Sequence, residues 1–279
     1  MMTRGMPLTA SQRAAGLALN LLAVSVALFL IAPILAILPL SMSDGEFLVY
    51  PVRGFSGRWF EALIASEKWR IAIRNSFLIG IAAAVIATVL GTLAAIGLAH
   101  ANFRGKSLVV GVLLSPLVVP IIIYAVGLTF FFAPLGLTQS YTGLVLAHAA
   151  LGSPFVVVTV GASLANFERN LMRAAASLGA TPVQAFRRVM LPLVAPGILT
   201  GALFAFAASF DEVVTVLFLA APEQRTIPRE MFSGIRESIS PIIAAASVVI
   251  VSMAVALMAT VAALRRRTSR LQAGNGERR

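Results

Sequence analysis

The stretch NFERNLMRAAASLGATPVQAFRRVMLPL occupies residues 166–193 and separates two long apolar runs. Its first part, residues 171–178, is rich in alanine, which favours a helix. Alanine side chains are small, so another protein's backbone can approach such a helix closely. Gly179 can adopt the positive φ that closes a helix. Thr181 and Pro182 then supply the N-cap and the first position of a second helix. The stretch therefore predicts two short helices joined at Gly179.

The second short helix is amphipathic. One face carries apolar residues at helical spacing, namely Val183, Phe186, Val189 and Met190. Leu191-Pro192 is expected to end this helix, because proline lacks an amide donor and disfavours helical geometry in the residue before it. An amphipathic loop of this kind either lies on a membrane surface or docks onto another protein, and its amphipathicity alone does not separate the two.

Apolar runs recur on both sides of this loop. The chain of 279 residues is 59% hydrophobic and 12% charged, whereas a soluble domain carries about 25% charged residues. A membrane-spanning helix needs about 20 mainly apolar residues. Six stretches qualify, at residues 15–40, 73–99, 108–133, 141–165, 195–220 and 239–264. We therefore expect an all-α membrane protein with six transmembrane helices. The first is too long for a removable signal and is expected to remain as an anchor.

The distribution of Lys and Arg predicts the orientation, because positively charged loops stay in the cytoplasm. If the spans alternate, one side of the membrane holds 14 basic residues against 2 acidic ones, and the other side holds 8 against 7. The basic side includes both ends of the chain, the loop at 166–193 and the Arg-rich tail at 265–279. We expect both termini in the cytoplasm of a bacterial cell, with a multi-pass chain in the inner (plasma) membrane and the tail acting as a topology anchor.

Several classes of function are excluded by what the sequence lacks. It contains no cysteine, and its two histidines, His100 and His148, are far apart, which argues against a metal site rich in these ligands. The arginines flank apolar runs, so no nucleic-acid partner is expected. Neither H-E-x-x-H nor G-x-S-x-G occurs. We expect a non-catalytic chain that binds no cofactor or metal of its own.

The spacing within the loop adds a resemblance to a known family. Ala174-Ala175, Gly179, Val189 and Leu191-Pro192 match the EAA loop of binding-protein-dependent ABC importer permeases, whose pattern is Glu-Ala-Ala, three residues, Gly, nine residues, Ile, one residue, Leu-Pro. This resemblance implies a type I importer permease fold, in which a cytoplasmic coupling loop at 166–193 fits a cleft in an ATPase. The coupling residues would be Arg173, Ala174, Ala175, Gly179, Phe186, Val189, Leu191 and Pro192.

One position departs from the family pattern. Arg173 stands where the pattern has its glutamate, so a salt bridge of the usual sign cannot form there. Glu168, five residues earlier, would be a substitute acid if the first short helix began before it.

Two further runs resemble polyamine-type permeases. They are HANFRGK at 100–106, followed by Pro116 and Pro120, and SFDEVV at 209–214. The whole resemblance covers roughly residues 71–264, after an anchor and extracytoplasmic segment at 1–70. It implies a second permease subunit, an ABC ATPase dimer that binds ATP and Mg, and an extracytoplasmic solute-binding protein. It favours spermidine or putrescine as substrate, with opines, amino-acid-like compounds or other small solutes as alternatives.

Asp211 and Glu212 are the only acids inside an expected span. A carboxylate at the centre of a membrane helix costs upwards of about 2.5 kcal/mol on insertion scales, so such residues face a cavity, a partner helix or a counter-ion. Adjacent helix positions differ by about 100°, so the two carboxylates are expected to have different surroundings. We expect at least one of them to line a path for a cationic substrate; the alternative is a structural salt bridge to an Arg.

Three other features allow two interpretations each. His100 is expected to cap the second span, and His148 to bond a neighbouring helix, although either is a conceivable ligand. Small residues recur every four positions at Gly197, Gly201, Ala205 and Ser209, which suits a helix contact inside the chain or with a partner permease. A free-standing secondary carrier or channel is the rival class, but it gives no reason for the patterned loop.

Overall fold

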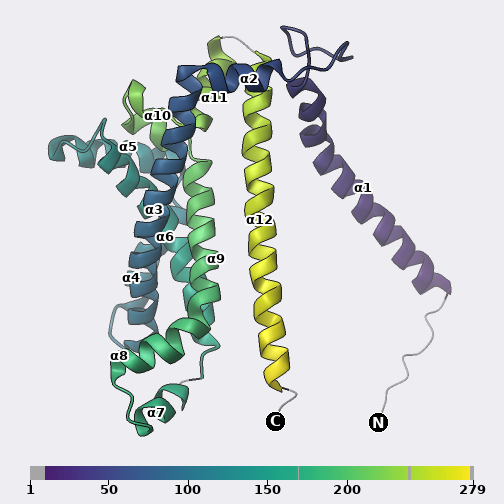
Figure 1. Ribbon diagram of the computed structural model, residues 1–279. Coiled ribbons are helices and arrows are strands. Elements are labelled where there is room, and N and C mark those ends of the chain that lie inside the picture. Colours follow the sequence, from purple (N-terminus) through teal and green to yellow (C-terminus); the bar gives the residue numbers. More distant parts are fainter. Residues whose placement is uncertain (1–9, 169, 238–239, 277–279) are drawn as a thin grey trace. The chain divides into compact units, whose positions relative to one another are not determined.

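The computed structural model describes residues 10–168, 170–237 and 240–276, and almost all regular structure there is helical (Figure 1). Within these ranges the only β feature is an isolated antiparallel bridge between Ser43 and Phe55. The chain divides into two compact units, one formed by residues 1–63 with 239–248 and the other by residues 64–238 with 249–279. The expected all-α architecture is confirmed.

The first unit contains the N-terminal anchor. Helix α1 (Ala10–Ser41) includes a 27-residue apolar segment from Ala15 to Ser41 with a mean hydropathy of 2.9. No residue in the most apolar part of this segment is buried. Side chains of this kind, exposed all round a long apolar helix, are suited to lipid. The first expected span is therefore present. The short helix α2 (Arg58–Ala65) follows an irregular segment with several bends.

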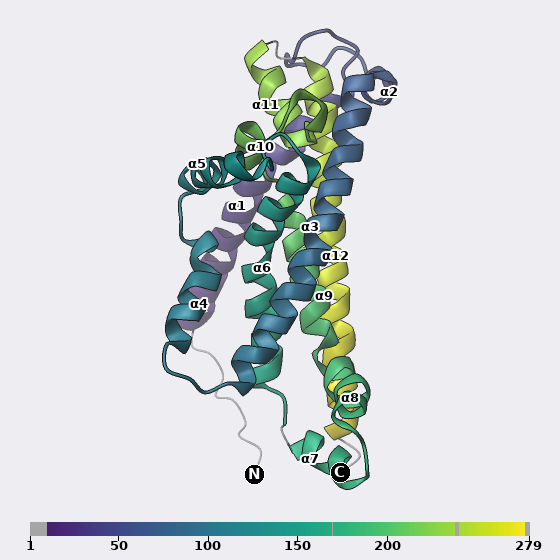
Figure 2. The ribbon, with the colours of Figure 1, turned by 90° about the vertical axis from the view of Figure 1, so that its left-hand side faces the viewer.

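Three long helices form the centre of the second unit. They are α3 (Glu67–His100), α6 (Tyr141–Ala165) and α9 (Leu191–Phe210), and they lie side by side (Figure 2). Their shared core is built mainly from small and β-branched residues, including Ala84, Ala87, Val156, Val160, Val194 and Ala205. Small side chains at the contacts allow helix backbones to approach closely, which is how helices associate in lipid.

The four-residue stripe of small residues on α9 packs against α6. A Cβ on Gly201 would lie 2.5 Å from Thr159 Oγ1, and a Cβ on Gly152 of α6 would lie 2.9 Å from the Cβ of Ala205. At the C-terminal end of the stripe, Ser209 contacts His148 of α6. The stripe was expected to form a helix contact either inside the chain or with a partner permease. The structure shows the contact inside the chain.

The third expected span is not one straight helix. Helix α4 (Lys106–Leu114), extended by a 3₁₀ turn at Ser115–Leu117, is followed by α5 (Ile121–Phe132), and the two parts meet at 105°. Pro116 begins the 3₁₀ turn and Pro120 immediately precedes α5. Each proline withdraws an amide donor and so interrupts a continuous helix. The described residues thus hold five candidate spans, or six if the bent pair counts as one.

The prediction of a continuous helix for the fifth expected span, 195–220, is also wrong. Helix α9 ends at Phe210, and a separate short helix α10 (Val214–Leu219) begins three residues after Asp211. At the other end, the helix starts earlier than expected, because residues Pro182–Phe210 form one apolar helical segment of 29 residues. The acid pair therefore lies just beyond a helix end and not within a helix.

The last helix is longer than expected. Helix α12 (Pro241–Gly276) contains most of the expected span 239–264 and continues as helical backbone through most of the basic tail at 265–279. Residues 238–239 and 277–279, and Arg4 and Arg169 among the topology charges, lie outside the described residues.

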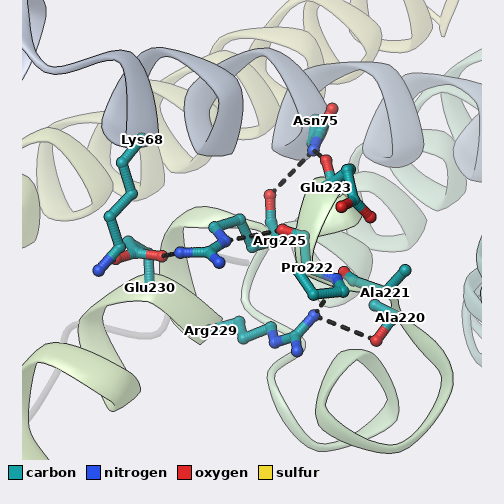
Figure 3. Close-up of polar contacts among 9 residues, drawn as sticks. All are labelled: Lys68, Asn75, Ala220, Ala221, Pro222, Glu223, Arg225, Arg229 and Glu230. Carbon is teal, nitrogen blue, oxygen red and sulfur yellow. Dashed lines mark hydrogen bonds and ion pairs between the residues drawn. The ribbon is translucent and has the colours of Figure 1, made fainter.

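A polar network joins the segment after α10 to α3, at the end of α3 opposite the loop at 166–193 (Figures 1 and 3). The amide of Asn75 in α3 donates to the backbone oxygens of Glu223 at 2.8 Å and Arg225 at 3.1 Å. The Tyr141 hydroxyl donates to Asn75 Oδ1 at 3.0 Å. Asn75 is completely buried, so these bonds satisfy an amide that would otherwise be costly to bury.

The same network contains a buried acid. Glu230 lies in the first turn of helix α11 (Ile227–Glu237) and is 2% exposed. Its carboxylate accepts from Arg225 Nη1 at 3.1 Å and pairs with Lys68 of α3 (Figure 3). Arg229 donates to the backbone oxygen of Ala221 at 2.9 Å. Burial, and secondarily the charge of Arg225, lower the pKa of the Arg229 guanidinium.

The close contact of α6 with α9 leads to a stability prediction. Gly152→Val places methyl groups against Ala205 and should lower stability by about 1–3 kcal/mol through overpacking. Gly161→Val is the matched control on the same helix, because a Cβ at Gly161 meets nothing within 4 Å. Thermal unfolding of the purified full-length chain in detergent measures both. Equal melting temperatures for the two variants would contradict the packing account.

A second prediction concerns the buried acid. Glu230→Gln removes the charge that balances Lys68 and Arg225, and should cost about 1.5–3 kcal/mol, the range for hydrogen bonds to charged groups. The expected loss of stability is modest because the side chains of Lys68 and Arg225 are 42% and 31% exposed, so that water screens their charges. Glu223→Gln is the control, since Glu223 is exposed in the same segment and only its backbone joins the network. An equal effect of both changes on the melting temperature would argue against a role for the buried charge.

Candidate functional site

The loop at 166–193 folds as two short helices joined at Gly179, as predicted. Helix α7 (Asn170–Ser177) is closed by Gly179, whose φ is +83°. The amide of Ala180 donates to Ala175 O at 3.0 Å, and the amide of Gly179 donates to Ala176 O at 2.9 Å. This pair of bonds is a Schellman closure, which requires a left-handed residue at the position of Gly179. A residue with a side chain would be strained there.

The second helix begins with a capping box. Thr181 Oγ1 accepts the amide of Gln184 at 3.3 Å, and Gln184 Oε1 accepts the amide of Thr181 at 3.0 Å, with Pro182 as the first residue of α8 (Pro182–Ala185). The predicted N-cap and first-turn proline are confirmed. Gln184 had no role in the sequence interpretation, although a Thr followed three residues later by Gln is the signal for such a box.

Leu191-Pro192 does not end this helix, contrary to the prediction. A π-helical turn, Phe186–Met190, connects α8 directly to α9, and the amide of Leu191 bonds the oxygen of Phe186. In an ordinary α-helix the ring of Pro192 would clash with the carbonyl one turn earlier. We attribute the continuity to the wider π turn, which gives that carbonyl room. The short helix and the membrane helix are therefore one piece.

One side of the loop packs against the helix bundle. Met172 and Phe186 contact the core shared by α3, α6 and α9, and Ala185 and Met190 are buried. Val183, expected on the same face, is instead 65% exposed. Its position in the first turn, directly after the proline, points it away from the bundle.

The opposite side of the loop is exposed. It includes Arg173, Ala174, Gly179, Leu191 and Pro192, whereas Ala175 and Val189 are half-buried. Leu178, beside Gly179, is 89% exposed. Glu168 lies before α7 begins, so the condition under which it would replace the family's acid on the first helix is not met. Figures 1 and 2 place α7 and α8 together at one end of the α3, α6 and α9 bundle.

Asp211 and Glu212 have different surroundings, as the sequence led us to expect. The Glu212 carboxylate accepts the amide of Thr215 at 2.7 Å and so caps the first turn of α10. Asp211 is exposed, and among the described residues its carboxylate has no hydrogen-bond or salt-bridge partner. The alternative of a salt bridge to an Arg of this chain is not found in that part of the structure.

Both acids line a cavity of about 440 Å³. Its wall also holds the aromatic rings of Phe155, Phe204 and Phe210 together with residues 250–257 of α12. A carboxylate next to aromatic faces is a suitable environment for an organic cation, since the faces of aromatic rings attract positive charge. The cavity can therefore accept an ammonium group at Asp211.

The two histidines have structural partners. His148 is fully buried in α6, with Nδ1 2.7 Å from Ser209 Oγ. His100 is the last residue of α3, and its Nδ1 lies 2.9 Å from Ile96 O. The expectations of a helix-bonding His148 and a capping His100 are confirmed. The sequence interpretation did not identify Asn75, Lys68 and Glu230 as a group. The only signal for it was Asn75, a polar residue at the start of an apolar run.

The comparisons with known proteins agree with this architecture. Residues 87–270 match the protein family described as binding-protein-dependent transport system inner membrane component. The spermidine/putrescine transport system permease protein PotC of Haemophilus influenzae is 34% identical over 69% of this chain and 75% of its own length. The putrescine transport system permease protein PotI of Escherichia coli K12 is 32% identical over 78% and 79%.

A solved structure shows the same fold at low identity. The crystal structure of a bacterial alginate ABC transporter, in complex with an alginate pentasaccharide-bound periplasmic protein, contains a chain with a TM-score of 0.71 and 18% identity. The match covers 92% of this chain and 96% of that one. The family match spans most of the helical bundle described above. This chain therefore belongs to the family of inner membrane components of binding-protein-dependent transport systems.

Proposed function

We propose that the chain is one of two permease subunits of an ATP-driven importer for a polyamine such as spermidine or putrescine. An extracytoplasmic binding protein delivers the solute, and an ABC ATPase dimer binds ATP and Mg and supplies the energy. Both termini and the loop at 166–193 lie on the cytoplasmic side of the inner membrane. The substrate class is supported by the likeness to spermidine/putrescine and putrescine permeases.

One observation carries the coupling role of the loop. Residues 182–210 form one continuous helical segment, whose first turn is fixed by the capping box and whose far end is followed by Asp211. A displacement of the loop by a closing ATPase dimer is therefore transmitted along a single rigid element to the cavity. ATP binding then shifts the population between two arrangements of the bundle, because the ATPase contacts them differently.

The two acids, Asp211 and Glu212, have different roles in the substrate path. One carboxylate oxygen of Glu212, Oε1, caps the first turn of α10, which ties this side chain to a structural contact. Asp211 has an unpaired carboxylate in the wall of an aromatic cavity, where an ammonium group of the substrate can neutralise it. The path therefore favours organic cations, and Asp211 makes the main contact.

The role of the loop predicts a sharp difference between two substitutions at one site. Gly179→Val should lower ATPase retention and uptake about fivefold to thirtyfold, because a β-branched residue in the left-handed region is strained by about 1–2 kcal/mol. Gly179→Asn should retain both, because Asn tolerates that conformation. Co-purification of the ATPase and uptake of radiolabelled spermidine into proteoliposomes with the full transporter measure the effect. Undiminished coupling in Gly179→Val would remove this role.

The path predicts unequal effects at the two acids. Asp211→Asn should reduce spermidine uptake roughly tenfold or more, the equivalent of losing one charge-assisted contact. Glu212→Gln should retain most uptake, because the amide oxygen can still accept from Thr215. Initial uptake rates in the same proteoliposomes give the comparison, with ATPase activity as the control for assembly. Full transport by both variants would eliminate the path role of the pair.

A further inference from the structure

All charged residues on helices α7 and α8 and on the π turn are basic. Arg173 on α7, and Arg187 and Arg188 on the π turn, are all exposed. None of the three forms a salt bridge within the described residues. The helices α7 and α8 and the π turn contain no acidic residue, and Glu168 lies before them. This surface therefore carries three positive charges that the chain itself does not balance.

The same segment also exposes apolar side chains. Leu178 is 89% exposed and Val183 is 65% exposed, before and after Gly179 in the sequence. Exposed large apolar side chains together with arginines are typical of a protein interface with a hydrophobic centre and a polar rim. The partner surface that fits is a groove with an apolar floor and acidic walls.

A membrane surface suits this part of the chain less well. A helix lying on lipid needs a continuous apolar face turned toward the bilayer. Here the apolar face, which includes Met172, Ala185, Phe186 and Met190, already packs against the chain's own bundle or is buried. What remains outside is mostly basic and small, with apolar groups concentrated at the tip.

We propose, as an extension of the coupling role, that Arg173 pairs with an acidic side chain of the ATPase groove. The charges at this contact are thus opposite to those implied by the family pattern, which has Glu at this position. Arg187 and Arg188 add to the attraction from the neighbouring turn. The cognate ATPase is recognised by an acidic groove, and an ATPase with a basic groove is rejected by like-charge repulsion.

The experiment uses the complete transporter in nanodiscs of neutral phosphatidylcholine. Arg173→Glu should weaken ATPase association at least about tenfold, because it places like charges together, whereas Arg173→Lys should stay close to the wild type. Wild-type association should weaken as salt rises. Arg104→Glu is the control, since Arg104 is exposed on the turn before α4, outside the loop.

The acidic partner can be located directly, because the chain has no cysteine. Arg173→Cys supplies the only thiol of this subunit, and short bifunctional cross-linkers should join it to the ATPase next to an Asp or Glu. Reversing that acid to Arg should restore association to Arg173→Glu. A restored pair would establish the charge order of the contact.

Several results would overturn the proposal. They are unchanged association in Arg173→Glu, equal losses in Arg173→Glu and Arg173→Lys, or a cross-link next to a basic residue only. An effect seen only when anionic lipid is present would assign Arg173 to the membrane surface instead. Loss of association in Gly179→Val, with no effect of charge at Arg173, would leave the coupling role intact and reject only the acidic groove.

Discussion

The close approach of α6 and α9 is the constraint on which the second unit depends. In lipid there is no hydrophobic effect to press apolar helices together, so helices associate through close packing and polar contacts. Gly197, Gly201 and Ala205 let the backbone of α9 approach α6, and the bond between Ser209 and His148 completes the contact near the C-terminal end of α9. The position of the loop at one end and of Asp211 at the other both follow from this contact.

Proline and acidic residues decide where the remaining helices break. Pro116 and Pro120 turn the third apolar stretch through 105°. The capping of α10 by Glu212 fixes a second helix start directly after α9 ends. Both breaks lie in sequence that is apolar enough to cross a membrane as one helix. Hydropathy therefore locates membrane segments well but does not show whether they are continuous.

The sequence was informative wherever the cause of a structure is local. The left-handed Gly179, the Thr181 cap and the first-turn Pro182 depend on a few neighbouring residues, and each was predictable. The buried network of Asn75 and Glu230 joins residues about 150 positions apart, and no local pattern indicates such a contact. The π turn was missed because a proline normally ends a helix, and no local pattern indicated the wider turn that gives Pro192 room.

The π turn also has a consequence for how the two ends of one helix can change independently. A single residue added to an α-helix rotates everything beyond it by about 100°, and a π turn absorbs such an addition locally. At the start of the turn, Ala185 is buried and Phe186 packs against the bundle core, and downstream the helix must present Gly197 and Gly201 to α6. The wider turn lets the helix keep both orientations, one on each side of the turn. Deleting one residue there would force a choice between a correctly oriented loop and a correctly packed membrane helix.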